Sequence, residues 1–118
     1  MEKRIELTLL MDFYGPLLTE HRLAILRLYC EEDMSFQEIA DQMGISRQGV
    51  HDAVKAAAAQ LTRYEAALGL ADRYRRIRGE VNACRELLDS VHADEESRPA
   101  LEAARAALDR ISVIETME

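Results

Sequence analysis

The apolar residues of this chain recur every three or four positions, which is the period of an α-helix. Near the start, this period predicts a short helix over residues 4–13 and a second helix over about 20–31. The pair Gly15-Pro16 breaks the pattern between them, and Thr19 is placed to cap the second helix. The pattern therefore predicts two amphipathic helices on either side of a tight break.

Helix signals are most explicit in the middle of the chain. Ser35 and Glu38 form a capping box, which predicts the start of a third helix. Gly44 is expected to end that helix in the left-handed conformation, which glycine enters without a steric cost. Ser46 then caps a fourth helix, which continues through an alanine-rich stretch. These signals predict two helices joined by a very short turn.

Gly69 ends the fourth helix, and beyond it the pattern changes to a heptad-like seam. The seam consists of Leu70, Tyr74, Ile77, Val81, Cys84, Leu88 and Val91. After a polar break, a last helix with Pro99 in its first turn carries a second seam of Leu101, Ala104, Leu108, Ile111 and Ile114. Two seamed helices joined by a short loop predict an antiparallel hairpin. The expected fold is therefore all-α, with a helix-turn-helix core over residues 1–69 and a helical hairpin over 70–118.

Residues 36–55 match the spacing of a helix-turn-helix. The steep crossing of the two helices needs a small residue, supplied by Ala40, and the turn needs a residue that tolerates positive φ, supplied by Gly44. The apolar inner faces are expected to comprise Ile39, Met43, Ile45, Val50 and Ala53. Because many positions satisfy one geometric requirement, the motif is a strong signal.

The outward face of the second helix of this motif carries the candidate nucleic-acid-binding residues Ser46, Arg47, Gln48, His51 and Lys55. Arginine suits guanine and glutamine suits adenine through paired hydrogen bonds, and both residues stand at the end of the helix that enters a major groove. The alternative is an ordinary solvated face on a structural core. Asp52 and a net charge of −7 favour that alternative, and the acidic balance excludes a protein that coats nucleic acid with its whole surface.

A second basic cluster begins the fifth helix and consists of Arg73, Arg75, Arg76 and Arg78. It could hold phosphates, but such residues are more often a solvated helix face. No catalytic signature, phosphate-binding glycine loop or cluster of metal ligands is visible, so we expect no enzyme activity, no cofactor and no metal. Cys30 and Cys84 are expected to be two buried thiols rather than a disulfide. No segment has the length or apolarity of a signal peptide or membrane span, so we expect a soluble, cytoplasmic protein with no membrane insertion.

Three segments together resemble a known family. They are Asp-Phe-Tyr-Gly-Pro-Leu-Leu-Thr at 12–19, Glu-Ile-Ala at 38–40 and Ile-Ser-Arg-Gln-Gly-Val-His-Asp at 45–52. This combination resembles the YlxM family of small bacterial helix-turn-helix proteins, whose three- or four-helix core is similar to the promoter-reading C-terminal region of sigma factors. The resemblance covers about residues 5–70. Genes of that family usually neighbour those of the signal recognition particle GTPase and its receptor, which implies a regulatory or auxiliary role in that pathway.

The functional expectation is a noncatalytic regulatory protein that binds DNA or the particle RNA. The alternative is a protein–protein adaptor that modulates the particle GTPases and reads no bases. We also expect a homodimer, with Tyr74, Ile77, Val81 and Leu88 in or beside its helical interface, because a hairpin with two apolar seams lacks a third layer. The alternative to the dimer is a monomer whose hairpin folds onto the first two helices.

Overall fold

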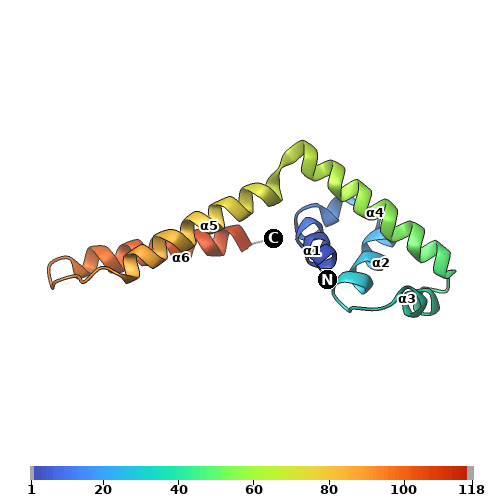
Figure 1. The fold of residues 1–118 in the computed structure, drawn as a ribbon, viewed down its shortest axis with the longest axis horizontal. Coiled ribbons are helices and arrows are strands. Elements are labelled where there is room, and N and C mark those ends of the chain that lie inside the picture. Colours follow the sequence, from blue (N-terminus) through green and yellow to red (C-terminus); the bar gives the residue numbers. More distant parts are fainter. Residues whose placement is uncertain (1, 117–118) are drawn as a thin grey trace. The chain divides into compact units, whose positions relative to one another are not determined.

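The structure is a computed structural model that describes the backbone of residues 2–116 and the side chains of residues 3–112. Figure 1 shows its elements, which are α1 (Glu2–Tyr14), a single 3₁₀ turn (Gly15–Leu17), α2 (Glu20–Cys30), α3 (Phe36–Met43), α4 (Arg47–Leu68), α5 (Leu70–Asp89) and α6 (Arg98–Thr116). Within this part of the chain there is no strand, and the predicted all-α fold is confirmed.

The chain divides into two compact units, Met1–Ala71 and Asp72–Glu118. In the first unit α4 is central and packs against each of α1, α2 and α3. The side chains with no exposed surface at the centre of this unit are Ile25, Leu26, Ile39, Val50, Ala57 and Leu61. Burying aliphatic side chains of this size stabilises a fold by about 1.5–3 kcal/mol each, so this core is the main source of stability for the first unit.

The predicted helix starts of the first unit are confirmed. Thr19, Ser35 and Ser46 each precede a helix, and each side-chain oxygen accepts a hydrogen bond from the amide three residues further on, at 3.2, 3.1 and 2.9 Å. Glu38 completes the capping box by accepting a hydrogen bond from the Ser35 amide at 3.1 Å. This bond lowers the pKa of the Glu38 carboxyl group. Local hydrogen bonds therefore determine where α2, α3 and α4 begin.

The two glycines predicted to end helices do so in the left-handed conformation. Gly44 has φ = 70° after α3, and Gly69 has φ = 63° after α4. A Cβ built at either position would meet no atom within 4 Å. Glycine is therefore required there by the backbone conformation rather than by close packing.

Tyr14 and Glu65 form a group of hydrogen bonds where α4 ends and α5 begins, which we call the polar joint. The hydroxyl of Tyr14, which is 1% exposed, donates a hydrogen bond to Glu65 Oε1 at 2.6 Å and accepts one from the Leu70 amide at 3.0 Å. The same carboxylate oxygen accepts a hydrogen bond from the Ala71 amide at 3.0 Å. Burial and the bond to Glu65 raise the pKa of the Tyr14 hydroxyl. Tyr14 and Glu65 thus satisfy one backbone donor each at the start of α5, where the helix itself leaves its amides free.

The second unit contains the predicted antiparallel hairpin of α5 and α6. Arg85 forms an ion pair with Asp109 at 2.8 Å, and Arg105 forms one with Asp89 at 2.5 Å, which sets the register of the two helices. The predicted seam holds in part, because Val81 is buried and its neighbours in the seam, Tyr74, Ile77 and Leu88, are half-buried.

Leu101, Ala104 and Leu108 of the second seam are half-buried as well, but the other predicted seam residues whose side chains the structure describes are not. Cys84 is exposed and the half-buried Arg85 takes its place between the helices, because a straight α-helix drifts away from a strict seven-residue repeat by about 20° per heptad. Leu70, Val91 and Ile111 are 38%, 51% and 38% exposed, and Val91 lies beyond the end of α5. The side chain of Ile114 lies outside the described residues.

The two cysteines are free, and the prediction of two buried thiols is wrong for Cys84. Cys30 is half-buried, and this burial raises the pKa of its thiol. Among the described residues, no helix combines the length and the apolar character that crossing a bilayer requires.

Candidate nucleic-acid interface

The helix-turn-helix forms from α3, the turn at Gly44 and the first half of α4. Ala40 is 2% exposed and its carbonyl accepts hydrogen bonds from the Gly44 and Ile45 amides at 2.9 and 3.1 Å, which closes the turn tightly. Ile39 and Val50 are fully buried. The remaining predicted inner-face residues, Met43, Ile45 and Ala53, are half-buried against the same core. The structure therefore brings together all the residues that the spacing assigned to the inner faces.

The predicted outer face lies on the first turns of α4. Arg47, Gln48, His51 and Lys55 are all exposed, and at 100° per residue they fall within one side of the helix. Ser46 stands at the head of this side, where its oxygen is engaged in the cap. We call these five residues the candidate recognition face. The cap at Ser46 and the turn at Gly44 fix where α4 begins relative to α3.

An acidic residue lies against this face. Gln48 Nε2 donates a hydrogen bond to Asp52 Oδ1 at 2.9 Å, and His51 Nδ1 lies 3.5 Å from the same oxygen. Glutamine pairs with adenine through its amide oxygen and one of its two amide hydrogens, so the bond to Asp52 leaves one amide hydrogen of Gln48 for a base and fixes the orientation of the amide. The carboxylate also repels phosphate, which makes this face less cationic than Arg47 and Lys55 alone suggest.

Aromatic contacts link the candidate recognition face to the helices packed behind it. The His51 ring meets Phe36 edge-on with centroids 5.8 Å apart, and Phe36 lies 5.3 Å from the ring of Tyr29. The guanidinium of Arg4 covers Tyr29 at 4.1 Å and also pairs with Asp33. The position of His51 is therefore tied to the packing of α1, α2 and α3.

A hollow of about 330 Å³ opens beside the recognition face. Its lining includes His51 and Lys55 from α4, the aromatic rings of Tyr29 and Phe36, and Lys3 from α1. Lys3 brings a third cationic side chain to the edge of the recognition face, and sequence reasoning missed it. The motif spacing concerns residues near each other in the chain, whereas Lys3 reaches this place only because α1 packs along α4.

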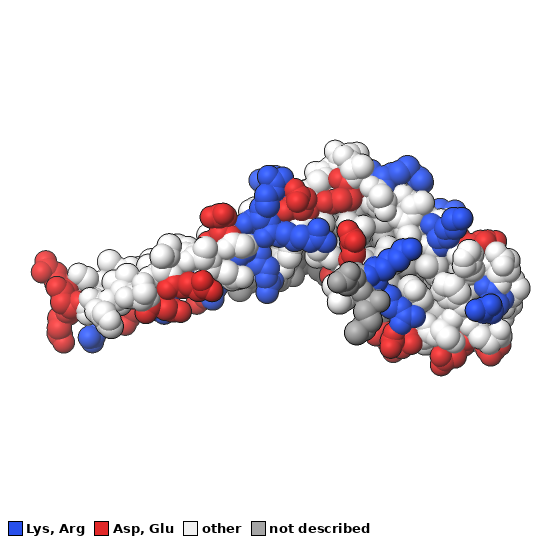
Figure 2. All heavy atoms as spheres, in the orientation of Figure 1, with Lys and Arg blue, Asp and Glu red and all other residues white. Residues whose placement is uncertain are grey.

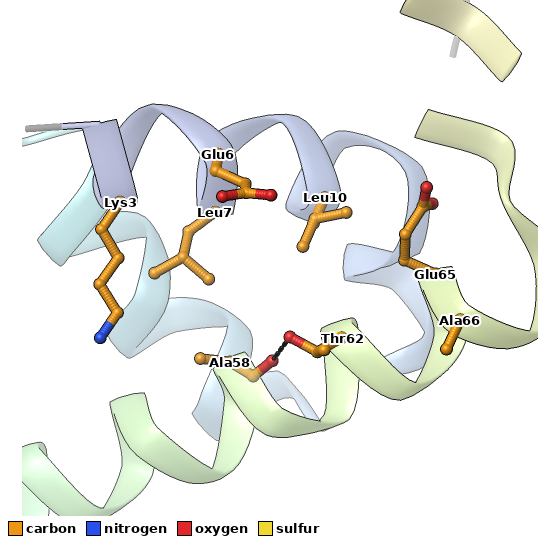
Figure 3. A pocket seen from close by; sticks show the side chains of 8 residues that line it. All are labelled: Lys3, Glu6, Leu7, Leu10, Ala58, Thr62, Glu65 and Ala66. Atoms are coloured by element: carbon orange, nitrogen blue, oxygen red, sulfur yellow. Dashed lines mark hydrogen bonds between the residues drawn. The ribbon is translucent and has the colours of Figure 1, made fainter. Parts of the chain in front are cut away.

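A second hollow of about 370 Å³ lies between α1 and α4 (Figure 3). Leu7 and Leu10 point into it from α1, and Ala58, Thr62 and Ala66 face them from α4. The Thr62 hydroxyl donates to the Ala58 carbonyl at 2.9 Å, so it is satisfied within its own helix. Lys3, Glu6 and Glu65 also line this hollow, so charged side chains border its apolar part.

The second predicted basic cluster lies on the first half of α5, where Figure 2 shows Lys and Arg side chains gathered. Arg73, Arg75, Arg76 and Arg78 are exposed. Arg76 forms an ion pair with Asp72 at 2.5 Å, and Arg78 donates to the Tyr74 hydroxyl at 2.6 Å. At 100° per residue the four arginines point to two flanks of the helix rather than to one face, so they do not form a single phosphate-binding surface.

Among the described residues, no group of three or more histidine, cysteine, aspartate or glutamate side chains is placed to hold a metal ion. His92, Glu95 and Glu96 are exposed in the loop of the hairpin.

A tight turn closed by the carbonyl of the buried Ala40, a capped second helix and a polar outer side are features of the helix-turn-helix class of protein. The chain belongs to the UPF0122 family, described as "Putative helix-turn-helix protein, YlxM / p13 like", whose model matches residues 1–102. The predicted resemblance to the YlxM family is therefore confirmed, and the match extends beyond residues 5–70 through α5 and into α6.

Similar proteins carry the same family name. A UPF0122 protein of Acetivibrio thermocellus is 40% identical over 105 residues, which are 89% of this chain and 87% of the relative. A relative from Symbiobacterium thermophilum is 45% identical over 103 residues, 86% and 88% of the two chains. A third, from Desulforamulus reducens, is 37% identical over 111 residues, 94% of each chain. The similarity therefore extends over the residues of α5 and into those of α6.

Proposed function

We propose that this protein is a noncatalytic regulatory protein that binds nucleic acid through the candidate recognition face. The observation that carries the proposal is the start of α4, where a capped helix end presents Arg47, Gln48, His51 and Lys55 together to solvent. Arg47 and Gln48 occupy the end that enters a groove, and Lys55 stands two turns further on, where it can reach a phosphate. Lys3 extends the cationic edge from α1. The family is named for its helix-turn-helix and not for a reaction, which supports a noncatalytic role.

We further propose that the target lies in the signal recognition particle pathway and that the protein acts in the cytoplasm. The support is the resemblance to the YlxM family, whose genes usually neighbour those of the particle GTPase and its receptor. This pathway offers two candidate targets, which are the DNA of the protein's own operon and the RNA of the particle. Both present phosphates to Arg47 and Lys55, and they differ in groove shape, since the deep major groove of an RNA helix is closed to side chains.

Substitutions on α4 test the binding proposal. In fluorescence anisotropy with labelled operon DNA and labelled particle RNA, Arg47→Ala and Lys55→Ala should each weaken binding at least about fivefold at physiological salt, with unchanged far-UV circular dichroism. If the lost contact is to a phosphate of duplex DNA, the slope of log K against log salt should fall by about 0.9. The matched control is Arg63→Ala, which removes the same charge from an exposed position on α4 outside the face. Equal binding by all three variants would place the interface elsewhere.

A second candidate is a protein adaptor that modulates the particle GTPases without reading bases. It is favoured by the carboxylate of Asp52, which occupies Gln48 at 2.9 Å, and by the net charge of −7. On this reading the face binds a protein surface, and the anisotropy experiment gives no salt-dependent binding to either nucleic acid. Calorimetry with the purified particle protein or its receptor would then give a binding isotherm that Arg47→Ala weakens.

A further inference from the structure

The hollow of about 330 Å³ beside the candidate recognition face, which we call the aromatic hollow, is lined by apolar and aromatic side chains. Leu7 from α1 and Val54 from α4 supply aliphatic surface and are themselves 6% and 8% exposed. Tyr29 from α2 and Phe36 from α3 supply rings whose centroids lie 5.3 Å apart. Small-molecule sites measure about 300–1,000 Å³, so the aromatic hollow has room for one small group and not for a helix.

The rings of the aromatic hollow are held in place by their neighbours. The guanidinium of Arg4 lies over the Tyr29 ring at 4.1 Å and also pairs with Asp33. The Phe36 ring meets the ring of His51 edge-on, and the His51 side chain is 50% exposed. Rings that are fixed before a ligand arrives lose little conformational freedom on binding, so more of the contact energy remains as affinity.

The charged residues of the aromatic hollow favour an anion. Lys3 and Lys55 line it from α1 and α4, both are exposed, and none of the described residues in its lining is acidic. The hollow in Figure 3 differs, because Glu6 and Glu65 are in its lining. In a chain with a net charge of −7, two lysines beside an apolar recess indicate a ligand that combines a flat apolar body with negative charge.

We propose, as an extension that rests on the function proposed above, that the aromatic hollow takes one unpaired base of an RNA while Lys3 and Lys55 hold the neighbouring phosphates. His51 and Lys55 belong both to this hollow and to the candidate recognition face, so a nucleic acid bound on that face lies next to the hollow. Proteins recognise bulges and loops of RNA by placing unstacked bases against aromatic side chains, with cations along the backbone. A fully paired duplex keeps its bases stacked and has none to insert.

Fluorescence anisotropy of the full chain with three labelled RNA duplexes of one sequence tests this proposal. The first duplex is fully paired, and the second contains a single bulged adenosine. The third contains the same bulge as an abasic residue, which keeps the phosphate and removes the base. The native chain should bind the adenosine bulge at least about tenfold more tightly than either of the other two, because contact with aromatic side chains strengthens binding by about this factor per base.

Two variants locate the bound base. Phe36→Leu removes a ring and keeps an apolar side chain, whereas Ala58→Leu adds bulk to the lining and keeps every ring and lysine. Each should reduce the preference for the adenosine bulge over the paired duplex to less than about twofold. The matched control is Phe13→Leu, which makes the same exchange at a half-buried ring of the same core outside the lining and should keep the native preference. Near-UV circular dichroism checks that each variant is folded, and Ala58→Leu alone decides the test if Phe36→Leu is not.

The outcomes separate this proposal from the function on which it rests. A native chain that binds the operon DNA or the paired RNA without preferring the adenosine bulge overturns the base site and leaves nucleic-acid binding intact. Equal affinity for the adenosine and abasic bulges overturns the base site too, since the phosphates alone would then explain binding. An Ala58→Leu variant that is as selective as Phe13→Leu places the base elsewhere. A chain that binds neither the operon DNA nor any of the three RNAs overturns both proposals.

Discussion

The polar joint at the start of α5 offers the sharpest test of how the first unit is stabilised. Tyr14→Phe keeps a ring that is 1% exposed and packs 5.9 Å from the ring of Tyr64, so it creates no appreciable cavity. It removes only the hydroxyl, which donates to Glu65 at 2.6 Å and accepts from the Leu70 amide at 3.0 Å. Any loss of stability therefore measures these two hydrogen bonds and the groups that they leave unsatisfied.

The expected loss follows from the partners. A hydrogen bond to a charged group contributes about 1.5–3 kcal/mol, and a neutral one about 1 kcal/mol. Water can reach part of this half-buried site and replaces part of the loss, so we expect Tyr14→Phe to cost about 2 kcal/mol. For a unit of this size that lowers Tm by roughly 10 °C.

Urea unfolding of the full chain, followed by the near-UV circular dichroism of its tyrosines, measures this cost. The matched control is Tyr64→Phe, whose hydroxyl accepts a single hydrogen bond from Gln60 at 2.9 Å in a half-buried position. That variant should lose less than about 1 kcal/mol. If Tyr14→Phe costs no more than Tyr64→Phe, the joint contributes nothing beyond packing and the reasoning is refuted.

The pH dependence supplies an independent check on Tyr14. Burial and Glu65 raise its pKa above the ordinary value of 10.0, so the unfolded chain releases this proton at a lower pH than the folded chain does. The stability that the joint contributes is then complete below pH 10 and is lost as the pH rises through the raised pKa. The stability difference between the native chain and Tyr14→Phe should therefore shrink above pH 10, and a difference that stays constant contradicts this assignment.

Two further predictions concern the helix-turn-helix itself. Gly44→Val should destabilise the first unit by at least about 1 kcal/mol in a thermal melt, because φ = 70° strains a branched residue even where no neighbouring atom crowds it. The control is Gly79→Ala, at an open helical position, which should be neutral or stabilising in the same measurement. The pKa of Glu38 is lowered because the Ser35 amide donates a hydrogen bond to its carboxylate. The contribution of Glu38 to folding stability is therefore present above the ordinary pKa of 4.5 and disappears as the pH falls through the lowered pKa. Glu38→Gln should flatten the curve of stability against pH in that acid range.

Local signals in the sequence were sufficient to locate the helices of the first unit. Thr19, Ser35 and Ser46 bond to amides three residues away, and Gly44 and Gly69 end helices through their own backbone conformation. Each of these signals acts within one turn of chain, so it does not depend on where other helices lie. The exposed positions of the recognition face follow from the same helix boundaries.

Interactions between distant segments could not be predicted in this way. The bonds of Tyr14 to Glu65 and Leu70 span more than fifty residues, so no local pattern around Tyr14 indicates them. Lys3 reaches the edge of the recognition face only through the packing of α1 on α4. The seam of the hairpin drifted at Cys84 because the heptad count assumes a supercoil that α5 does not maintain.

The bond between Gln48 and Asp52 has a consequence for how long a bound complex would last. The carboxylate of Asp52 accepts one of the two amide hydrogens of Gln48, so a base that binds through that hydrogen has to compete with Asp52. A target that does not use the Gln48 amide leaves this bond intact, so the competition lowers the affinity only for targets that Gln48 contacts. Affinity differences among variants of one interface appear mainly in the dissociation rate. Asp52 would therefore shorten residence times on those targets, and a protein built this way would exchange quickly between them and follow changes in their abundance.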